Sequence, residues 1–238
     1  SRHVSAFSTP SMALNSKRAA QTAFGTMNRV LSTPTSAGHP ASTRLFSATK
    51  EEVDPGIVDG TDLRIVKYPH PSLRADNAEI TEDELADGSI KKIAKEMFLV
   101  MYAAEGVGLA APQVGINKRL MVYNESGDKN KWLSEVVMVN PRIVEFSDAQ
   151  DVETEGCLSF PEMNGPVQRS KWIKVEALNL KGKKTKKKFK GWEARIFQHE
   201  YDHLDGVVYV DRLEEDSKKE VQPRLDELIA DFGEGGAL

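Results

Sequence analysis

Two histidines and a glutamate in the C-terminal third of the chain have the spacing of a metal site. His199 and His203 lie four positions apart in the segment Gln-His-Glu-Tyr-Asp-His-Leu, so an α-helix would place both imidazoles on one face, where they could bind one divalent cation. Glu200 would then reach a water molecule on that cation. The pattern predicts metal-assisted hydrolysis, although two histidines at this spacing also occur by chance in ordinary helices.

A catalytic site for a tetrahedral metal has three protein ligands and a water in the fourth place, so the two histidines need a partner. Cys157 is the single cysteine of the chain and follows Gly156 in Glu-Gly-Cys-Leu-Ser. A thiolate beside a divalent cation is held deprotonated. A lone cysteine is more often a small buried hydrophobic residue. From the residues alone, both interpretations stay open.

Residues 106–115 read Gly-Val-Gly-Leu-Ala-Ala-Pro-Gln-Val-Gly, which formally matches a dinucleotide-binding pattern. That pattern needs a strand before it and a helix after it, whereas a helix is expected before this segment and Pro112 disfavours helical geometry at Ala111. Small residues that end in an amide favour instead an extended rim, where a peptide backbone could pair and Gln113 could donate to a carbonyl oxygen. A tight connection would explain the glycines but not Gln113.

Taken together, three motifs resemble the signature motifs of the peptide deformylase family. They are Gly-x-Gly-Leu-Ala-Ala-x-Gln at 106–113, Glu-Gly-Cys-Leu-Ser at 155–159 and Gln-His-Glu-x-Asp-His-Leu at 198–204, and they occur in the family's order. The resemblance extends over residues 62–215 and is close to the eukaryotic organellar members. Some features are similar to mitochondrial members and others to plastid ones, and we prefer a plastid over a mitochondrion.

The resemblance implies a hydrolase that removes the formyl group from the N-terminal formylmethionine of nascent organelle-made proteins and releases formate. It implies a metal bound by Cys157, His199 and His203, with water as the fourth ligand. Glu200 would take the proton of this water and deliver it to the departing amine. By ligand softness the default metal is Zn²⁺, but the family implies Fe²⁺, with Zn²⁺, Ni²⁺ or Co²⁺ as substitutes, and we follow the family.

The same resemblance assigns the residues around the substrate. The Gln113 side chain and the Leu158 backbone N–H would stabilise the oxyanion. Helical spacing puts Trp192 and Ile196 on the stripe that carries the two histidines, although such stripes are usually core. The residues expected to bind the methionyl end of the substrate are Val107, Gly108, Trp192 and Ile196.

Two rival classes of enzyme share parts of this pattern. A zincin-like metallopeptidase would use His199, Glu200 and His203 with a downstream acidic ligand, either Glu214 or Glu220, and would leave the cysteine idle. A hydrolase with a cysteine nucleophile would pair the thiol with one histidine and need no ion. A purely structural metal site would fill all four places with protein ligands.

Composition divides the chain into two parts. Residues 1–50 contain six Lys/Arg and no Asp/Glu, and are rich in Ser, Thr and Ala. This is typical of a transit peptide, so we predict a disordered transit peptide and linker over 1–60 and a catalytic domain over 61–238. No run of eighteen apolar residues occurs, which excludes a membrane-spanning helix. We expect no DNA partner.

Seven lysines fall within Lys181–Lys190. We expect an exposed hairpin there. Most such runs are only solvated turns; the alternative is contact with ribosomal RNA, which would place the enzyme where its substrate emerges.

The periodicity predicts an α+β fold with antiparallel β-sheets packed around a central metal-binding helix, between an N-terminal and a C-terminal helix. A capping box at 81–84 predicts the start of a helix. From Ser89, apolar residues at helical spacing predict a long helix that ends at Gly106. A structural ion pair between Arg169 and Asp202 near the metal helix is a further expectation. The remaining predicted elements are strands at 120–123, 136–139, 143–146 and 172–177, a helix at 192–204, and a helix at 214–232 that is broken or kinked near Pro223.

Overall fold

The computed structural model describes residues 58–233. The predicted transit peptide and linker lies almost entirely outside the described residues, as do the last five residues of the predicted catalytic domain. Within the described part, no helix has both the length and the apolar character needed to cross a membrane.

Two helices open the described part of the chain. α1 (Glu82–Ala86) has the predicted capping box: the Glu84 N–H donates to the Thr81 side chain, and the Thr81 N–H donates to the Glu84 carboxylate. α2 (Ser89–Ala103) follows, and its apolar stripe is buried in one core cluster with the neighbouring strands, through Ile90, Met97 and Met101. The helix expected from the 3.6-residue period is therefore present.

The larger sheet has five antiparallel strands in the order β1-β2-β3-β6-β7. The strands predicted at 136–139 and 143–146 are one long strand, because bulges bend it without ending it. The lysine run forms an edge strand that pairs with its predecessor, so the predicted hairpin is confirmed. The strands are β1 (Gly108–Ala110), β2 (Leu120–Tyr123), β3 (Val136–Phe146), β6 (Trp172–Leu178) and β7 (Lys184–Lys190).

A second sheet of two strands, β4 (Gln150–Cys157) and β5 (Phe160–Ser170), was not expected from the sequence. β4 is rich in polar residues, and its outer half is exposed, so it lacks the apolar alternation of a half-buried strand. β5 does alternate, with Met163, Val167 and Arg169 turned inward. An arginine on the buried face conceals that period in the sequence.

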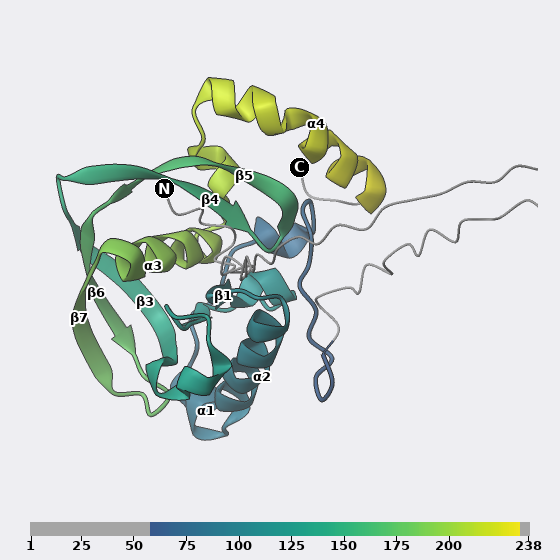
Figure 1. The fold of residues 1–238 in the computed structure, drawn as a ribbon. Coiled ribbons are helices and arrows are strands. Elements are labelled where there is room, and N and C mark those ends of the chain that lie inside the picture. Colours follow the sequence, from purple (N-terminus) through teal and green to yellow (C-terminus); the bar gives the residue numbers. More distant parts are fainter. Residues whose placement is uncertain (1–57, 234–238) are drawn as a thin grey trace, which may run out of the picture. The chain divides into compact units, whose positions relative to one another are not determined.

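α3 (Gly191–Leu204) lies between the two sheets (Figure 1). One side of it packs through Ile196 and Phe197 into a core cluster that also contains Met121, Ile173 and Phe189 of the larger sheet. Its polar side chains are buried as well, including both histidines. This confirms the predicted α+β fold, in which antiparallel sheets surround a central helix.

The last helix, α4 (Glu215–Phe232), packs beside β5, where Leu228 joins a cluster with Met163 and Leu213. It runs through Pro223 as one helix. The predicted break at that proline is therefore wrong, whereas the alternative of a kink stays a prediction. Packing of the apolar face offsets the backbone hydrogen bond that proline cannot donate.

Candidate metal centre

Three side chains from distant parts of the chain meet beside α3. Cys157 ends β4, and the two histidines lie one turn apart on the helix. The Cys157 Sγ lies 3.2 Å from His203 Nε2, and the ligand atoms of Cys157, His199 and His203 all lie within 4.8 Å of one another. All three residues are buried. Ligand atoms at these separations can bind one tetrahedral ion.

A buried carboxylate orients the first histidine. Glu155 Oε2 lies 2.9 Å from His199 Nδ1, which leaves Nε2 as the ring nitrogen that can face an ion. Glu155 also accepts hydrogen bonds from Arg169 and Arg195. Burial alone would raise its pKa, but the Arg169 charge and the His199 hydrogen bond outweigh burial and lower it. Glu155 therefore stays ionised and fixes the histidine ring.

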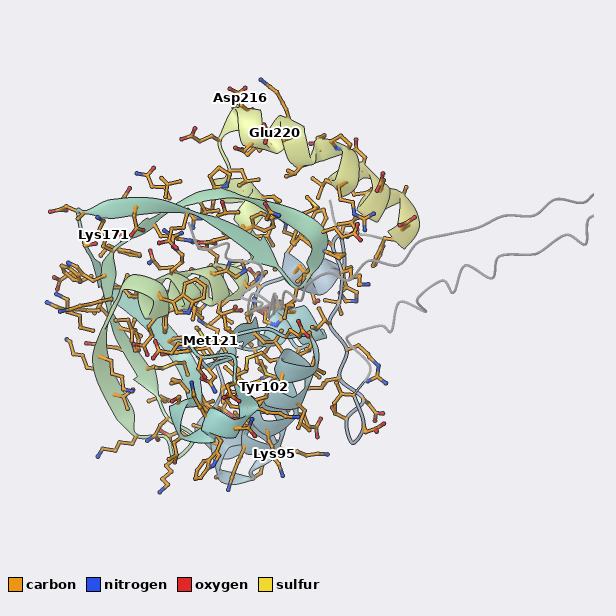
Figure 2. All side chains as sticks on the ribbon, in the orientation of Figure 1. Lys95, Tyr102, Met121, Lys171, Asp216 and Glu220 are labelled. Atoms are coloured by element: carbon orange, nitrogen blue, oxygen red, sulfur yellow. The ribbon has the colours of Figure 1, made fainter. Side chains whose placement is uncertain are left out.

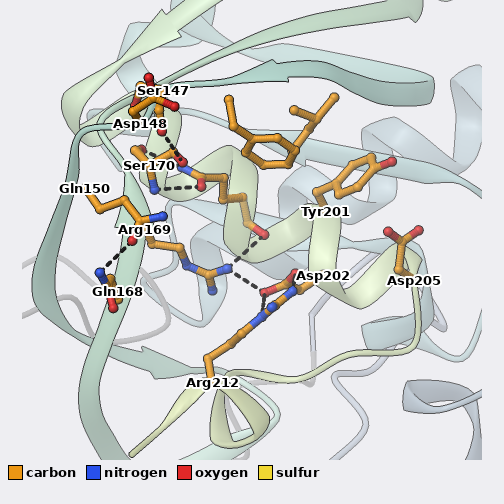
Figure 3. Close-up of a pocket in the computed structure, with 13 residues that line it drawn as sticks. Ser147, Asp148, Gln150, Gln168, Arg169, Ser170, Tyr201, Asp202, Asp205 and Arg212 are labelled. Carbon is orange, nitrogen blue, oxygen red and sulfur yellow. Dashed lines mark hydrogen bonds and ion pairs between the residues drawn. The ribbon is translucent and has the colours of Figure 1, made fainter.

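The same network extends along α3 to Asp202, and Figure 3 shows Arg169, Asp202 and Arg212 beside one another. Asp202 accepts from both Arg169 and Arg212, so the predicted Arg169–Asp202 ion pair is confirmed. These three residues line a polar cavity of about 620 Å³. The arginine thus joins two acidic residues on opposite sides, Glu155 at the metal site and Asp202 at the cavity.

Glu200 is fully buried, and within residues 58–233 its Oε2 has no hydrogen-bond partner. Burial and the nearby Glu155 charge raise its pKa well above the ordinary value. A Cβ at Gly108 would lie 2.5 Å from Glu200 Oε1, so only glycine lets β1 approach the carboxylate this closely. The unpaired oxygen fits a group that exchanges a proton with a water molecule on a cation.

Gln113 lies in a 3₁₀ turn, η2 (Ala111–Val114), and not in an extended rim as predicted. Only Gly108–Ala110 is extended, since Pro112 favours the first turn of a helix-like segment. The Gln113 Oε1 accepts from the Ala110 N–H at 2.7 Å. Its Nε2 therefore faces the centre, 3.5 Å from Cys157 Sγ.

The pKa shifts of Cys157 and His203 fit a site that binds a cation. Burial, with the Glu200 charge nearby, raises the pKa of the Cys157 thiol. Burial, with the neighbouring His199, lowers the pKa of His203 well below its ordinary value, which leaves the imidazole neutral and able to bind metal. A divalent cation would supply the positive charge that a thiolate needs here. The donor set therefore fits a divalent metal ion.

Of the four residues predicted to bind substrate, Gly108 lies against Glu200, and the other three share one core cluster. Val107 and Ile196 belong to one core cluster, and Trp192 packs against its edge, where its Nε1 donates to the Glu125 carbonyl. Leu158 is half-buried and follows the cysteine. Packing in the core is thus established for Ile196, whereas contact with substrate stays a prediction for the whole set.

Neither acidic residue required by the zincin-like alternative joins the centre. Glu214 and Glu220 are both exposed, and the one His/Cys/Asp/Glu cluster suited to a metal among residues 58–233 is Cys157, His199 and His203. Two further residues beside the centre, Glu155 and Arg195, were not predicted from the sequence. Their signal was available, since Glu155 belongs to the cysteine motif and Arg195 lies one helical turn before the first histidine.

Comparison with known proteins decides the family. The model of the polypeptide deformylase family matches residues 62–219. The chain belongs to the polypeptide deformylase family. This family resemblance was predicted from the three motifs, and the match covers all of them.

Among deformylase relatives, the chain is 42% identical over 176 residues to peptide deformylase 1B, chloroplastic, of Oryza sativa subsp. japonica, which covers 74% of the chain and 64% of the relative. It is 40% identical to peptide deformylase 1B, chloroplastic/mitochondrial, of Arabidopsis thaliana, over 75% of the chain and 64% of the relative. A crystal structure of the Plasmodium falciparum peptide deformylase matches with a TM-score of 0.69 and 41% identity, over 74% of the chain and 100% of that structure. The chain thus spans less than two thirds of the length of the plant relatives.

Proposed function

We propose that this chain is a metal-dependent peptide deformylase that hydrolyses the formyl group of N-formylmethionyl nascent peptides. The observation that carries the proposal is the meeting of Cys157, His199 and His203 beside a buried carboxylate, Glu200, whose outer oxygen is unpaired. Three protein ligands are the number expected of a catalytic rather than a structural site.

When bound, the divalent ion supplies Lewis-acid activation of the formyl carbonyl and of a water molecule. Glu200 is the general base and acid: it takes a proton from the attacking water and delivers it to the amine nitrogen as the C–N bond breaks. Its raised pKa suits both steps, because the carboxyl can hold the proton between them. The products are formate and a peptide with a free amino terminus.

Two amide groups serve the developing oxyanion. Gln113 is locked by the hydrogen bond that its Oε1 accepts from the Ala110 N–H, so its Nε2 donates without reorganising. The Leu158 backbone N–H, next to the cysteine, is the second donor. Donors fixed before the reaction are worth far more than donors that must reorient.

The methionine side chain would lie against an apolar wall beside the centre. Val107 precedes β1 and belongs to the same core cluster as Ile196, while Trp192 closes its edge. Gly108 adds backbone of an edge strand, where an extended peptide could pair. These four residues are the proposed substrate-binding set.

We propose Fe²⁺ as the native ion, with Zn²⁺, Ni²⁺ or Co²⁺ able to replace it. One thiolate and two imidazoles suit any of these first-row ions. Support for an organelle as the site of action comes from the plant relatives, whose names specify chloroplast or chloroplast and mitochondrion. The basic, acid-free first fifty residues favour the same compartments, and we retain plastid over mitochondrion.

A ribosome contact through Lys181–Lys190 is part of this proposal. β7 is the edge strand of the larger sheet, and its lysines are exposed. Lys188 Nζ lies 3.4 Å from the centre of the Trp172 ring, a cation–π contact that holds this lysine on the surface of the sheet. Salt-sensitive binding to ribosomes should be lost when these lysines are replaced by glutamines; unchanged binding would refute the contact.

The deciding experiment is formate release from formyl-Met-Ala-Ser by anaerobically purified protein. We expect release that stops with a chelator and returns with Fe²⁺. Chelator-resistant release would point to a cysteine nucleophile. A Cys157→Ser variant with full metal content and activity would show that the thiol is not a ligand, while Glu214→Gln, a control on an exposed residue, should behave as the parent.

A further inference from the structure

An apolar groove of about 750 Å³ along one face of α2 takes no part in the proposed reaction, since none of the metal ligands lines it. Its lining comes from α2, β3 and a 3₁₀ segment, η3 (Lys129–Ser134). Two of its apolar side chains are unusually open to solvent: Leu99 is 40% exposed and Trp132 is 64% exposed. Large apolar residues gathered in a concavity indicate a binding site rather than scattered surface residues.

Most of the charged residues that line the groove are basic. Lys91, Lys95 and Lys129 line it, and within residues 58–233 none of the three has an ion-pair partner. Glu135 is the one acidic residue of the lining, and it already accepts a hydrogen bond from the Tyr102 hydroxyl at 3.0 Å. Figure 2 shows Lys95 and Tyr102 along α2.

The spacing of two of these lysines also favours an anionic ligand, because it brings like charges together. Lys91 and Lys95 are four residues apart on one helix face, where like charges repel. Lys92, which does not line the groove, has a carboxylate neighbour in Glu96. The groove thus concentrates unpaired positive charge beside apolar surface, and a ligand with a negative head and an apolar body would satisfy both.

From this geometry we infer that the groove binds a single-chain anionic amphiphile, with the hydrocarbon chain against Phe98, Leu99 and Trp132 and the carboxylate between Lys91 and Lys95. The volume lies within the range of small-molecule sites. The carboxylate would complement the unpaired lysines, and a single hydrocarbon chain would cover the exposed Leu99 and Trp132. This inference is independent of deformylation.

The test is a calorimetric titration of the full chain with dodecanoate below its micelle-forming concentration, with Trp132 emission as a second readout. We expect one saturable site per chain and a blue shift that the Trp132→Phe variant lacks. Dodecyltrimethylammonium, with the same chain and the opposite charge, should bind at least about tenfold more weakly. Equal binding of the two probes, or no saturable binding, would overturn the inference.

Lys91→Gln with Lys95→Gln should weaken dodecanoate binding about tenfold. The matched control is Lys67→Gln with Lys171→Gln, two exposed lysines outside the groove, which should leave binding unchanged. Circular dichroism checks folding, and Leu99→Asp provides an independent loss of binding. Equal losses in both lysine pairs, or a dimer in sedimentation that Leu99→Asp abolishes, would contradict the site.

Discussion

Gly108 lies so close to Glu200 that a larger residue there should disturb the carboxylate. A methyl group there would lie 2.5 Å from the Glu200 carboxylate, far inside van der Waals contact. We predict that Gly108→Ala displaces Glu200 and lowers kcat about 100-fold, the usual contribution of a general base, while metal content stays unchanged. Steady-state formate release with metal analysis on the same sample checks this; wild-type kcat would show that the carboxylate can move freely.

The buried carboxylate of Glu155 is shared by two arginines and one histidine. Glu155→Gln leaves Arg169 and Arg195 without their shared carboxylate, so we expect a loss of about 3–5 kcal/mol in the free energy of unfolding. Metal affinity should fall about 10- to 100-fold, because His199 loses its orienting partner. Glu153→Gln, on the exposed part of the same strand, should cost less than about 1 kcal/mol.

The sign of the pH dependence follows from the lowered pKa of Glu155. A carboxyl whose pKa is lower in the folded chain stabilises it above the unfolded-state pKa of about 4.3, and this stabilisation is lost as the pH falls below it. The difference in unfolding free energy between wild type and Glu155→Gln should thus be constant near neutrality and shrink below about pH 4. Denaturant titrations across pH measure it, and a difference that grows on acidification would reverse the assignment.

Residue types predicted only part of the site. The His199–His203 pair follows from helical spacing, but the thiol of Cys157 was assigned as a ligand only through family resemblance, since no local pattern joins residues 42 positions apart. Glu155 and Arg195 were missed because a buried charge network depends on how β4 meets α3. Pairings of this kind are set by tertiary packing, which periodicity does not report.

Helices with strong apolar periodicity were predicted correctly from the sequence, whereas strands rich in polar residues were not. α2 and α3 were predicted because their apolar residues repeat at helical spacing. β4 and β5 were missed because their polar residues pair across strands and with α3 instead of facing an apolar core. α4 was expected to be broken or kinked near Pro223, yet it is one helix, whose Leu228 packs into the neighbouring cluster.

The proline inside α4 should lower the stability of the helix. Pro223 lies in the interior of α4 and cannot donate the backbone hydrogen bond of its turn, so Pro223→Ala should raise the free energy of unfolding by about 1–3 kcal/mol. Gln222→Ala, one residue earlier, is the control and should change stability by less than about 0.5 kcal/mol. Equal effects of the two changes, measured by urea unfolding, would mean that α4 is already distorted enough to accommodate the proline.

On the scale of the whole catalytic fold, α3 connects every part of the mechanism. It carries two of the proposed metal ligands and the proposed general base, lies beside the thiol of the smaller sheet and the amide of Gln113, and is held by buried arginine–carboxylate pairs. A centre assembled in this way depends on the complete fold. Metal binding and folding should therefore stabilise each other.

The most direct test of the central claim is the absorption spectrum of the Co²⁺-substituted protein, recorded for the wild type and for Cys157→Ser. Three ligands that include a thiolate predict an intense near-ultraviolet sulfur-to-cobalt charge-transfer band and visible bands of tetrahedral intensity, and the variant should lose the charge-transfer band together with formate release. Identical spectra from the two proteins would contradict the proposed centre.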